Sequence, residues 1–147
     1  MTRLFTALLV ALALPAGAQS TSDAAPFAPL NAADVELSTF LWTARPVIVF
    51  ADTEADPRFQ EQMDLLFARV EELEERDVVV ITDTDPDAEG AIRLKLRPRG
   101  FQLALIGKDG GVKLRKPFPW DVRELTRVID KMPMRQREIR ERAVLDE

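Results

Sequence analysis

The side chains that could perform chemistry in this 147-residue chain are carboxylates, amines, guanidinium groups and hydroxyls, because the sequence contains no Cys, no His and no Tyr. Without Cys the protein has no disulfide, no thiol redox chemistry and no zinc–thiolate site. Without His it lacks the commonest general base and metal ligand. We therefore expect a protein that is not an enzyme and carries no cofactor, with a carboxylate- or metal-dependent hydrolase as the alternative.

The segment Asp83-Thr84-Asp85-Pro86-Asp87 is one of two carboxylate groups on which such a hydrolase could be built. A phosphotransfer Asp-x-Asp site usually has Thr two residues after its second Asp, where this chain has Asp87. An EF-hand calcium loop beginning at Asp83 would need Gly and Glu where Ala88 and Leu94 stand. The pattern therefore favours a structural role, in which Asp85 caps a helix whose first turn is acidic.

Asp52, Glu54 and Asp56 form the second carboxylate group. A hard cation prefers such oxygen ligands, and close like charges need a neutralising partner. Asp56 is more simply explained as the N-cap of a helix whose first residue is Pro57. We therefore expect no metal site here, and Asp52, Asp56 and Asp83 remain the carboxylates of the alternative hydrolase.

Charge is segregated along the chain, with 14 acidic and 3 basic residues over 51–89 but 15 basic and 6 acidic residues over 91–142. The two halves either lie side by side and neutralise each other, or the basic half attracts an acidic partner or a second copy. The net charge of −5 argues against nucleic acid. An apolar loop over 117–120 either covers the core or forms an exposed docking patch. The candidate partner-binding residues are Arg97, Arg99, Lys113, Arg115, Lys116 and Trp120.

These side chains are positioned by a predicted alternation of strands and helices. The apolar run 47–50 is typical of a strand buried on both faces, and Phe40 and Trp42 are expected to pack beneath it. Apolar residues at helical spacing predict a helix over 57–73, and the run 78–81 predicts a second buried strand. A strand, a helix and a strand in this order form a right-handed βαβ unit with parallel strands.

The second half of the chain predicts a shorter helix after Pro86, an antiparallel pair of strands and a last helix. Strands over 103–106 and 112–115 flank a turn at 108–111, where Asp-Gly tolerates the positive φ that hairpins need. Asp121 begins the last core helix with a capping-box pattern, and Pro133 ends it. The order β-α-β-α-β-β-α predicts an α/β, thioredoxin-like domain whose mixed sheet has the strand order 2-1-3-4.

The N-terminal segment has the pattern of a secretory signal peptide. Arg3 precedes an apolar run over 4–14 that is too short to span a bilayer, and Ala16-Gly17-Ala18 forms a small-x-small cleavage site. We expect cleavage after Ala18, rather than a retained anchor, no transmembrane segment thereafter, and a periplasmic or secreted protein. The resulting plan is a signal peptide over 1–18, a flexible linker over 19–34, a domain over 35–133 and an exposed, charged tail over 134–147.

Four segments together resemble the DUF4174 family, a group of small exported bacterial proteins of unknown function. They are residues 45–51, 56–58, the glycine-hairpin run 107–115 and the Met-Pro-Met-Arg run 132–135. The last two are fairly specific in combination, and the resemblance extends over residues 37–140. It implies a thioredoxin- or peroxiredoxin-like fold and supplies no catalytic residues.

The resemblance also shows where the chain departs from redox-active members of that fold. Such proteins place a Cys at the N-terminus of the helix after the first strand, where the helix dipole favours a thiolate. Here the corresponding stretch, 52–56, carries three carboxylates, and Phe101 stands where the fold has its cis-proline. We therefore expect the redox site to be absent and the protein to bind a partner in the cell envelope through its surface.

Overall fold

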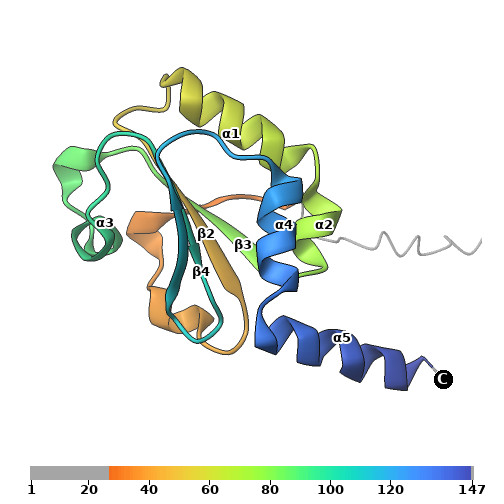
Figure 1. Cartoon of the computed structure of the whole chain (residues 1–147). Coiled ribbons are helices and arrows are strands. Elements are labelled where there is room, and N and C mark those ends of the chain that lie inside the picture. The colour runs from red at the N-terminus through yellow and green to blue at the C-terminus, as the bar shows by residue number, and fades with distance from the viewer. Residues whose placement is uncertain (1–26, 147) are drawn as a thin grey trace, which may run out of the picture.

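The computed structural model describes residues 27–146, so the predicted signal peptide, its cleavage site after Ala18 and the first part of the linker lie outside the described residues. The centre of the fold is a five-stranded mixed sheet with the order β1-β3-β2-β4-β5 (Figure 1). β1, β3 and β2 run parallel, whereas β4 and β5 are antiparallel to their neighbours. The strands are β1 (Leu30–Asn31), β2 (Arg45–Phe50), β3 (Val78–Asp83), β4 (Gln102–Ile106) and β5 (Val112–Lys116).

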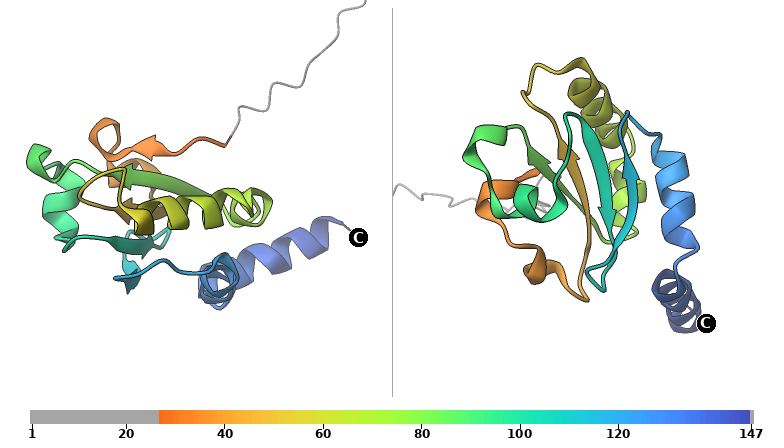
Figure 2. Two further views of the ribbon diagram at one scale, coloured as in Figure 1. Left: turned by 90° about the horizontal axis from the view of Figure 1, so that it is seen from above. Right: turned by 60° about the vertical axis from the view of Figure 1, so that its left-hand side comes forward.

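Helices cover both faces of the sheet (Figure 2). On one face a core of Val47, Leu103 and their neighbours packs against three helices, and on the other face Ile48 and Phe50 pack against a fourth helix and the N-terminal segment. The first three are α1 (Pro57–Phe67), α2 (Val70–Glu74) and α4 (Val122–Asp130); the fourth is α3 (Ala91–Leu96). Both faces of β2 are buried along its whole length, as its apolar run predicts.

The predicted strand order is confirmed, because β3, β2, β4 and β5 are adjacent in that order. The structure adds β1 at the β3 edge. Leu30 and Asn31 pair with β3, and the Asn31 side chain accepts a hydrogen bond of 2.9 Å from the Ala33 N–H. Residues 30–34, which the sequence analysis placed in the linker, therefore belong to the folded part, since a two-residue strand is too short to give a periodic signal.

The predicted helix over 57–73 is two helices. α1 ends at Phe67, and Arg69 has φ −138° and ψ 41°, which turns the chain before α2 begins at Val70. The apolar spacing continues across this break, so periodicity alone cannot detect it. The predicted start is confirmed, because Asp56 caps α1 and Pro57 is its first residue.

The predicted cap at Asp85 is wrong. The Asp85 side chain caps nothing; its own N–H instead donates to the Asp83 side chain at 3.2 Å. A 3-10 turn over Pro86–Ala88 follows, Glu89 turns the chain with φ 45°, and α3 starts only after Gly90. The short side chain of Asp83 forms the turn here, a local arrangement that competes with helix capping.

Trp42 does not pack beneath the first strand as predicted. It is 65% exposed, with φ 64°, and its N–H donates to the Lys108 carbonyl at 2.8 Å. Phe40 does pack against the core on the α3 side. Backbone geometry, rather than the hydrophobicity of the indole, sets the direction of Trp42.

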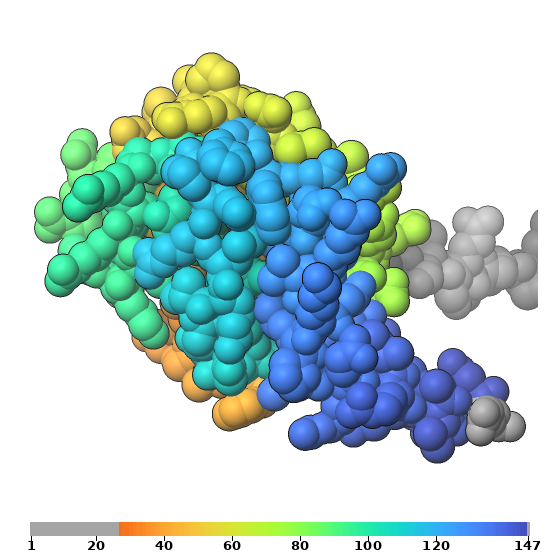
Figure 3. All heavy atoms as spheres, viewed as in Figure 1, coloured from red at the N-terminus to blue at the C-terminus, as the bar shows by residue number. Residues whose placement is uncertain are grey.

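The C-terminal tail is not a free appendage. α4 ends at Asp130, before the predicted stop at Pro133, and Pro133 is instead the first residue of a further helix, α5 (Pro133–Leu145). The first turns of α5 lie against the body of the protein and its C-terminal end projects away from it (Figures 1 and 3). Arg135 is only 2% exposed, so the predicted exposure fails for this part of the tail. No described helix is both long and apolar enough to cross a membrane.

Candidate functional site

The end of the sheet where β2 terminates carries the carboxylates at the place of a thioredoxin redox centre. The Asp56 side chain accepts a hydrogen bond of 2.9 Å from the backbone N–H of Arg58 and forms a 2.8 Å ion pair with the Arg58 guanidinium. The side-chain hydrogen bond from Arg58 lowers the pKa of Asp56. Arg58 also lies over the ring of the buried Phe101, 5.7 Å from its centroid. Asp56 is therefore an ionised helix cap, a poor general base.

Asp83, the third carboxylate of the alternative hydrolase, is buried and paired. Arg93 Nη2 lies 2.9 Å from Asp83 Oδ1 and also donates to the carbonyls of Ala51 and Asp83, each at 3.1 Å. The Arg93 guanidinium lies 5.5 Å from the centroid of the Phe50 ring. This arginine joins the ends of β2 and β3. Within residues 27–146 no group of three carboxylates could hold a metal ion, while Asp52, Glu54 and Asp85 point to solvent.

The six predicted partner-binding residues do not form one patch. Arg115 and Lys116 lie on opposite faces of β5 because side chains alternate in a strand, and Lys113 lies at a register shift in the pairing of β5 with β4. Arg115 donates to the Leu96 carbonyl at the end of α3, and Lys116 lies 4.7 Å from the centroid of the Trp120 ring. Arg97 and Arg99 are exposed on the loop after α3.

Trp120 is half-buried and held in place from α1. The backbone N–H of Trp120 donates a hydrogen bond to Gln62 Oε1 at 2.8 Å, and its backbone carbonyl accepts one from Gln62 Nε2 at 3.1 Å. Trp120 also packs against the core on the α1 side, whereas Phe118 is 52% exposed. The loop 117–120 therefore covers the core at Trp120 and leaves one aromatic side chain in solvent.

The opposite end of the sheet, where β2 begins, contains a pocket of about 350 Å³. The pocket lies between the turn that joins β4 to β5 and the start of α5. Its lining residues are Arg45, Gly107, Lys108, Asp109, Lys113, Met132, Pro133, Met134 and Arg137. We call it the Arg45 pocket. Of the six predicted partner-binding residues, only Lys113 lines it.

The glycines of the β4–β5 turn hold the Lys113 side chain at the pocket. Gly110 adopts φ 82°, and the Gly107 N–H donates to the Gly111 carbonyl at 2.9 Å. A Cβ at Gly107 would lie 2.6 Å from Lys113 Cε, so the Lys113 side chain runs across the turn directly beside Gly107. Lys113 Nζ reaches Asp109 at 2.8 Å.

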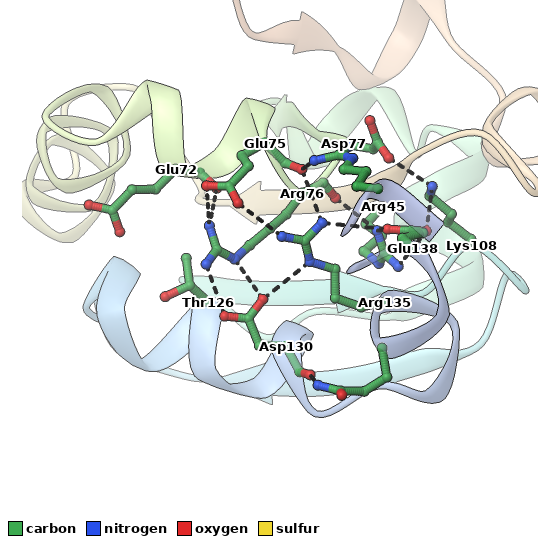
Figure 4. A network of polar contacts seen from close by, with 12 residues as sticks. Arg45, Glu72, Glu75, Arg76, Asp77, Lys108, Thr126, Asp130, Arg135 and Glu138 are labelled. Atoms are coloured by element: carbon green, nitrogen blue, oxygen red, sulfur yellow. Dashed lines mark hydrogen bonds and ion pairs between the residues drawn. The ribbon is translucent and has the colours of Figure 1, made fainter. Parts of the chain in front are cut away.

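A buried ion-pair network supports the pocket (Figure 4). Arg45, 1% exposed, binds Glu138 of α5 through two hydrogen bonds of 3.0 and 3.2 Å. Lys108 Nζ lies 2.7 Å from Glu138 and 2.8 Å from Asp77. Burial alone would raise the pKa of Glu138, but the hydrogen bonds from Arg45 and Lys108 hold that pKa below its ordinary value.

A second set of ion pairs fixes the start of α5 to α2 and α4. Arg135 lies 3.2 Å from Glu75 and 3.3 Å from Asp130, and Arg76 binds the same Asp130 at 2.9 Å (Figure 4). Burial would raise the pKa of Asp130, and hydrogen bonds from Arg76 and Arg135 lower it overall. In each set at least one pair joins residues far apart in sequence, Arg45–Glu138 in the first and Glu75–Arg135 in the second, so both sets position the helix that forms one wall of the pocket.

Sequence reasoning did not select Arg45, Arg135 or Glu138 as functional candidates. Isolated charged residues at the ends of predicted elements are normally solvated, and the neighbouring residues in the sequence do not indicate that these are buried. One signal was present. Arg45, Lys108 and Arg135 each lie inside a segment that carries the family resemblance, and these three segments meet at the pocket.

Solved structures with a similar fold are peroxiredoxins. One, a Plasmodium yoelii Prx1a modified at its N-terminus, aligns with a TM-score of 0.54 and 15% identity, over 70% of this chain and 81% of that chain. A Plasmodium yoelii thioredoxin peroxidase I aligns with a TM-score of 0.50 and 17% identity, over 70% and 80% of the two chains. At these identities the likeness establishes the thioredoxin-like fold and nothing about activity.

The comparison with protein families gives one match. A family model described as a domain of unknown function, DUF4174, matches residues 36–138. That span includes both sides of the Arg45 pocket. No curated protein matches the chain.

Proposed function

The chain belongs to the DUF4174 family, to which no function is assigned, and we propose from its own residues that it is a non-catalytic binding protein of the cell envelope that engages a protein partner at the Arg45 pocket. One observation carries this proposal. Three of the four segments that resemble the family, which are distant in sequence, converge on this pocket and on the ion pairs beneath it.

The structure of the pocket suits binding better than catalysis. Three of its cations, Arg45, Lys108 and Lys113, are held by ion pairs. Its acidic side chain, Asp109, is the partner of Lys113, whose hydrogen bond lowers the Asp109 pKa. A carboxylate whose pKa is lowered is a weak proton acceptor at neutral pH. Rigid, preorganised charge at a concave surface is instead typical of recognition sites.

The alternative of a carboxylate-dependent hydrolase has less support. Asp56 and Asp83 are each neutralised by an arginine, and they belong to separate hydrogen-bond systems. A hydrolase would need at least one carboxylate free to accept a proton or bind a cation near a second functional group.

Affinity capture tests the proposed function. The chain after Ala18 is immobilised and exposed to an envelope extract of the source cells, beside a variant with K113E and R137E at the pocket. A matched control carries K95E and R123E, two exposed cations that do not line the pocket. We expect the wild type and the control to retain a common partner that the pocket variant loses. Retention of that partner by the pocket variant, with an unchanged melting temperature, contradicts the proposal.

Export is part of the same proposal and rests on the pattern of residues 1–18. Cell fractionation followed by mass spectrometry should find a protein that begins at Gln19 outside the cytoplasm. A full-length cytoplasmic product would contradict this part.

A further inference from the structure

The Arg45 pocket has an excess of positive charge over acidic charge. The cations Arg45, Lys108, Lys113 and Arg137 line it. The carboxylates that pair with them are Asp77, Asp109 and Glu138. Four cations against three carboxylates leave one positive charge, and the exposed Arg137 forms no ion pair within residues 27–146. The whole chain carries a net charge of −5, so this pocket differs in sign from the molecule.

Two sets of backbone and side-chain donors at the pocket lack partners. Arg45 is 1% exposed, yet its Nε has no hydrogen-bond partner among the described residues. α5, a 13-residue helix, begins at the pocket with Met132 at its N-cap and receives no side-chain cap. α1 and α4 are capped by Asp56 and Asp121. An uncapped helix N-terminus presents free N–H groups and a partial positive charge that favour an anion.

The wall of the pocket that the start of α5 contributes is partly apolar. Met132, Pro133 and Met134 line it next to the cations. A volume of about 350 Å³ is at the small end for ligand pockets, which is enough for one or two residues of a peptide. A single residual charge beside an apolar wall suits a monoanion that carries an apolar substituent.

We propose that the Arg45 pocket binds a monocarboxylate with an apolar side chain, which in a protein partner is a C-terminal residue such as leucine. This inference rests on the proposed function and specifies its ligand chemistry. The carboxylate would lie at the start of α5 and near Lys113 and Arg137, and the apolar side chain would contact the methionines. A flexible thioether accommodates side chains of different shape.

The test uses three small probes and the chain after Ala18, followed by ¹⁵N NMR. N-acetylleucine carries the carboxylate and side chain, N-acetylleucinamide removes only the charge, and inorganic phosphate tests for a general anion site. We expect saturable shifts of the amides over 107–113 and 132–137 with N-acetylleucine. N-acetylleucinamide should produce no shifts at equal concentration, and phosphate should bind more weakly than N-acetylleucine.

Two variants assign the contacts. Arg137→Gln and Lys113→Gln should each weaken N-acetylleucine binding by about fivefold, the loss expected for a partly exposed charge contact. Lys95→Gln, remote from the pocket, should leave it unchanged. The inference would be overturned if N-acetylleucinamide bound as tightly as N-acetylleucine, if phosphate bound more tightly, or if the shifts were confined to other residues.

The outcomes separate this inference from the proposed function. Partner capture that depends on the pocket, without N-acetylleucine binding, refutes the carboxylate ligand and leaves the proposed function intact. N-acetylleucine binding at the pocket without any captured partner supports the ligand chemistry and contradicts the protein partner.

Discussion

At the scale of single residues, Glu138 connects the C-terminal helix to the start of the sheet. It accepts hydrogen bonds from Arg45, 93 positions away in sequence, and from Lys108. Both cations are nearly inaccessible to solvent, so neither can be left unpaired without a cost in free energy. Glu138 thus supports the pocket through two buried cations.

Replacing Glu138 tests this dependence. Glu138→Gln keeps the size of the side chain and removes its charge, which leaves Arg45 without a counterion and Lys108 with Asp77 alone. We expect the free energy of unfolding to fall by about 3 kcal/mol. Urea denaturation measures the change. Glu141→Gln, exposed on the same helix, should stay within about 0.5 kcal/mol of the wild type. Similar stabilities for both variants would refute a supporting role for Glu138.

Two glycines of the β4–β5 turn differ in what they tolerate. Gly110 has φ 82°, and a Cβ added there would lie 2.9 Å from Leu41 Cδ2. At Gly107 an added Cβ would lie closest to the end of the flexible Lys113 side chain. We expect Gly110→Ala to destabilise the protein by about 1 kcal/mol and Gly107→Ala by less. Thermal unfolding of the two variants compares them. A larger loss for Gly107→Ala would show that the Lys113 side chain cannot move aside.

At the scale of elements, α5 shows best what the sequence could not reveal. Strands β2, β3 and β4 were predictable because their apolar runs are local and continuous. α5 has no apolar face, and its position depends on Arg45 and Glu75, which are distant in sequence. Local patterns record burial through hydrophobicity, so a helix that docks through ion pairs looks like a solvated tail. The carboxylates of the alternative hydrolase could be found from sequence, but not their arginine partners.

The docking of α5 should depend on pH. Glu138 and Asp130 have pKa values below their ordinary values of 4.5 and 3.8, because arginine and lysine stabilise the ionised forms. Their contribution to stability is therefore complete above the unfolded pKa values and is lost as the pH falls through the folded ones. We expect the free energy of unfolding to decrease below a pH of about 4.5 and the decrease to be smaller in Glu138→Gln. A pH series of urea titrations measures both slopes, and parallel curves would contradict the assignment.

At the scale of the whole molecule, the acidic and basic halves of the chain neutralise each other in part. Asp83–Arg93, Asp77–Lys108 and Glu75–Arg135 each join a carboxylate of the first half to a cation of the second. The segregation of charge seen along the sequence is thereby reduced in space. The remaining positive charge at the Arg45 pocket is local, not a property of the whole basic half.

The same pairing predicts how the protein responds to metal ions. With Asp56 and Asp83 held by arginines, millimolar Ca²⁺, Mg²⁺ or Mn²⁺ should leave the melting temperature unchanged. A real site would raise it in proportion to the logarithm of metal concentration over the dissociation constant. An increase of this logarithmic form for any of the three ions, abolished by Asp83→Asn, would favour the hydrolase instead.

We propose that this thioredoxin-like fold binds its partner at the end of the sheet opposite to the usual redox centre. Hydrogen exchange of the chain alone and with its captured partner tests it most directly. We expect the partner to slow exchange over residues 107–113 and 132–138 and to leave residues 52–58 unchanged. Protection at 52–58 and around Phe101, without protection at the Arg45 pocket, would contradict the claim.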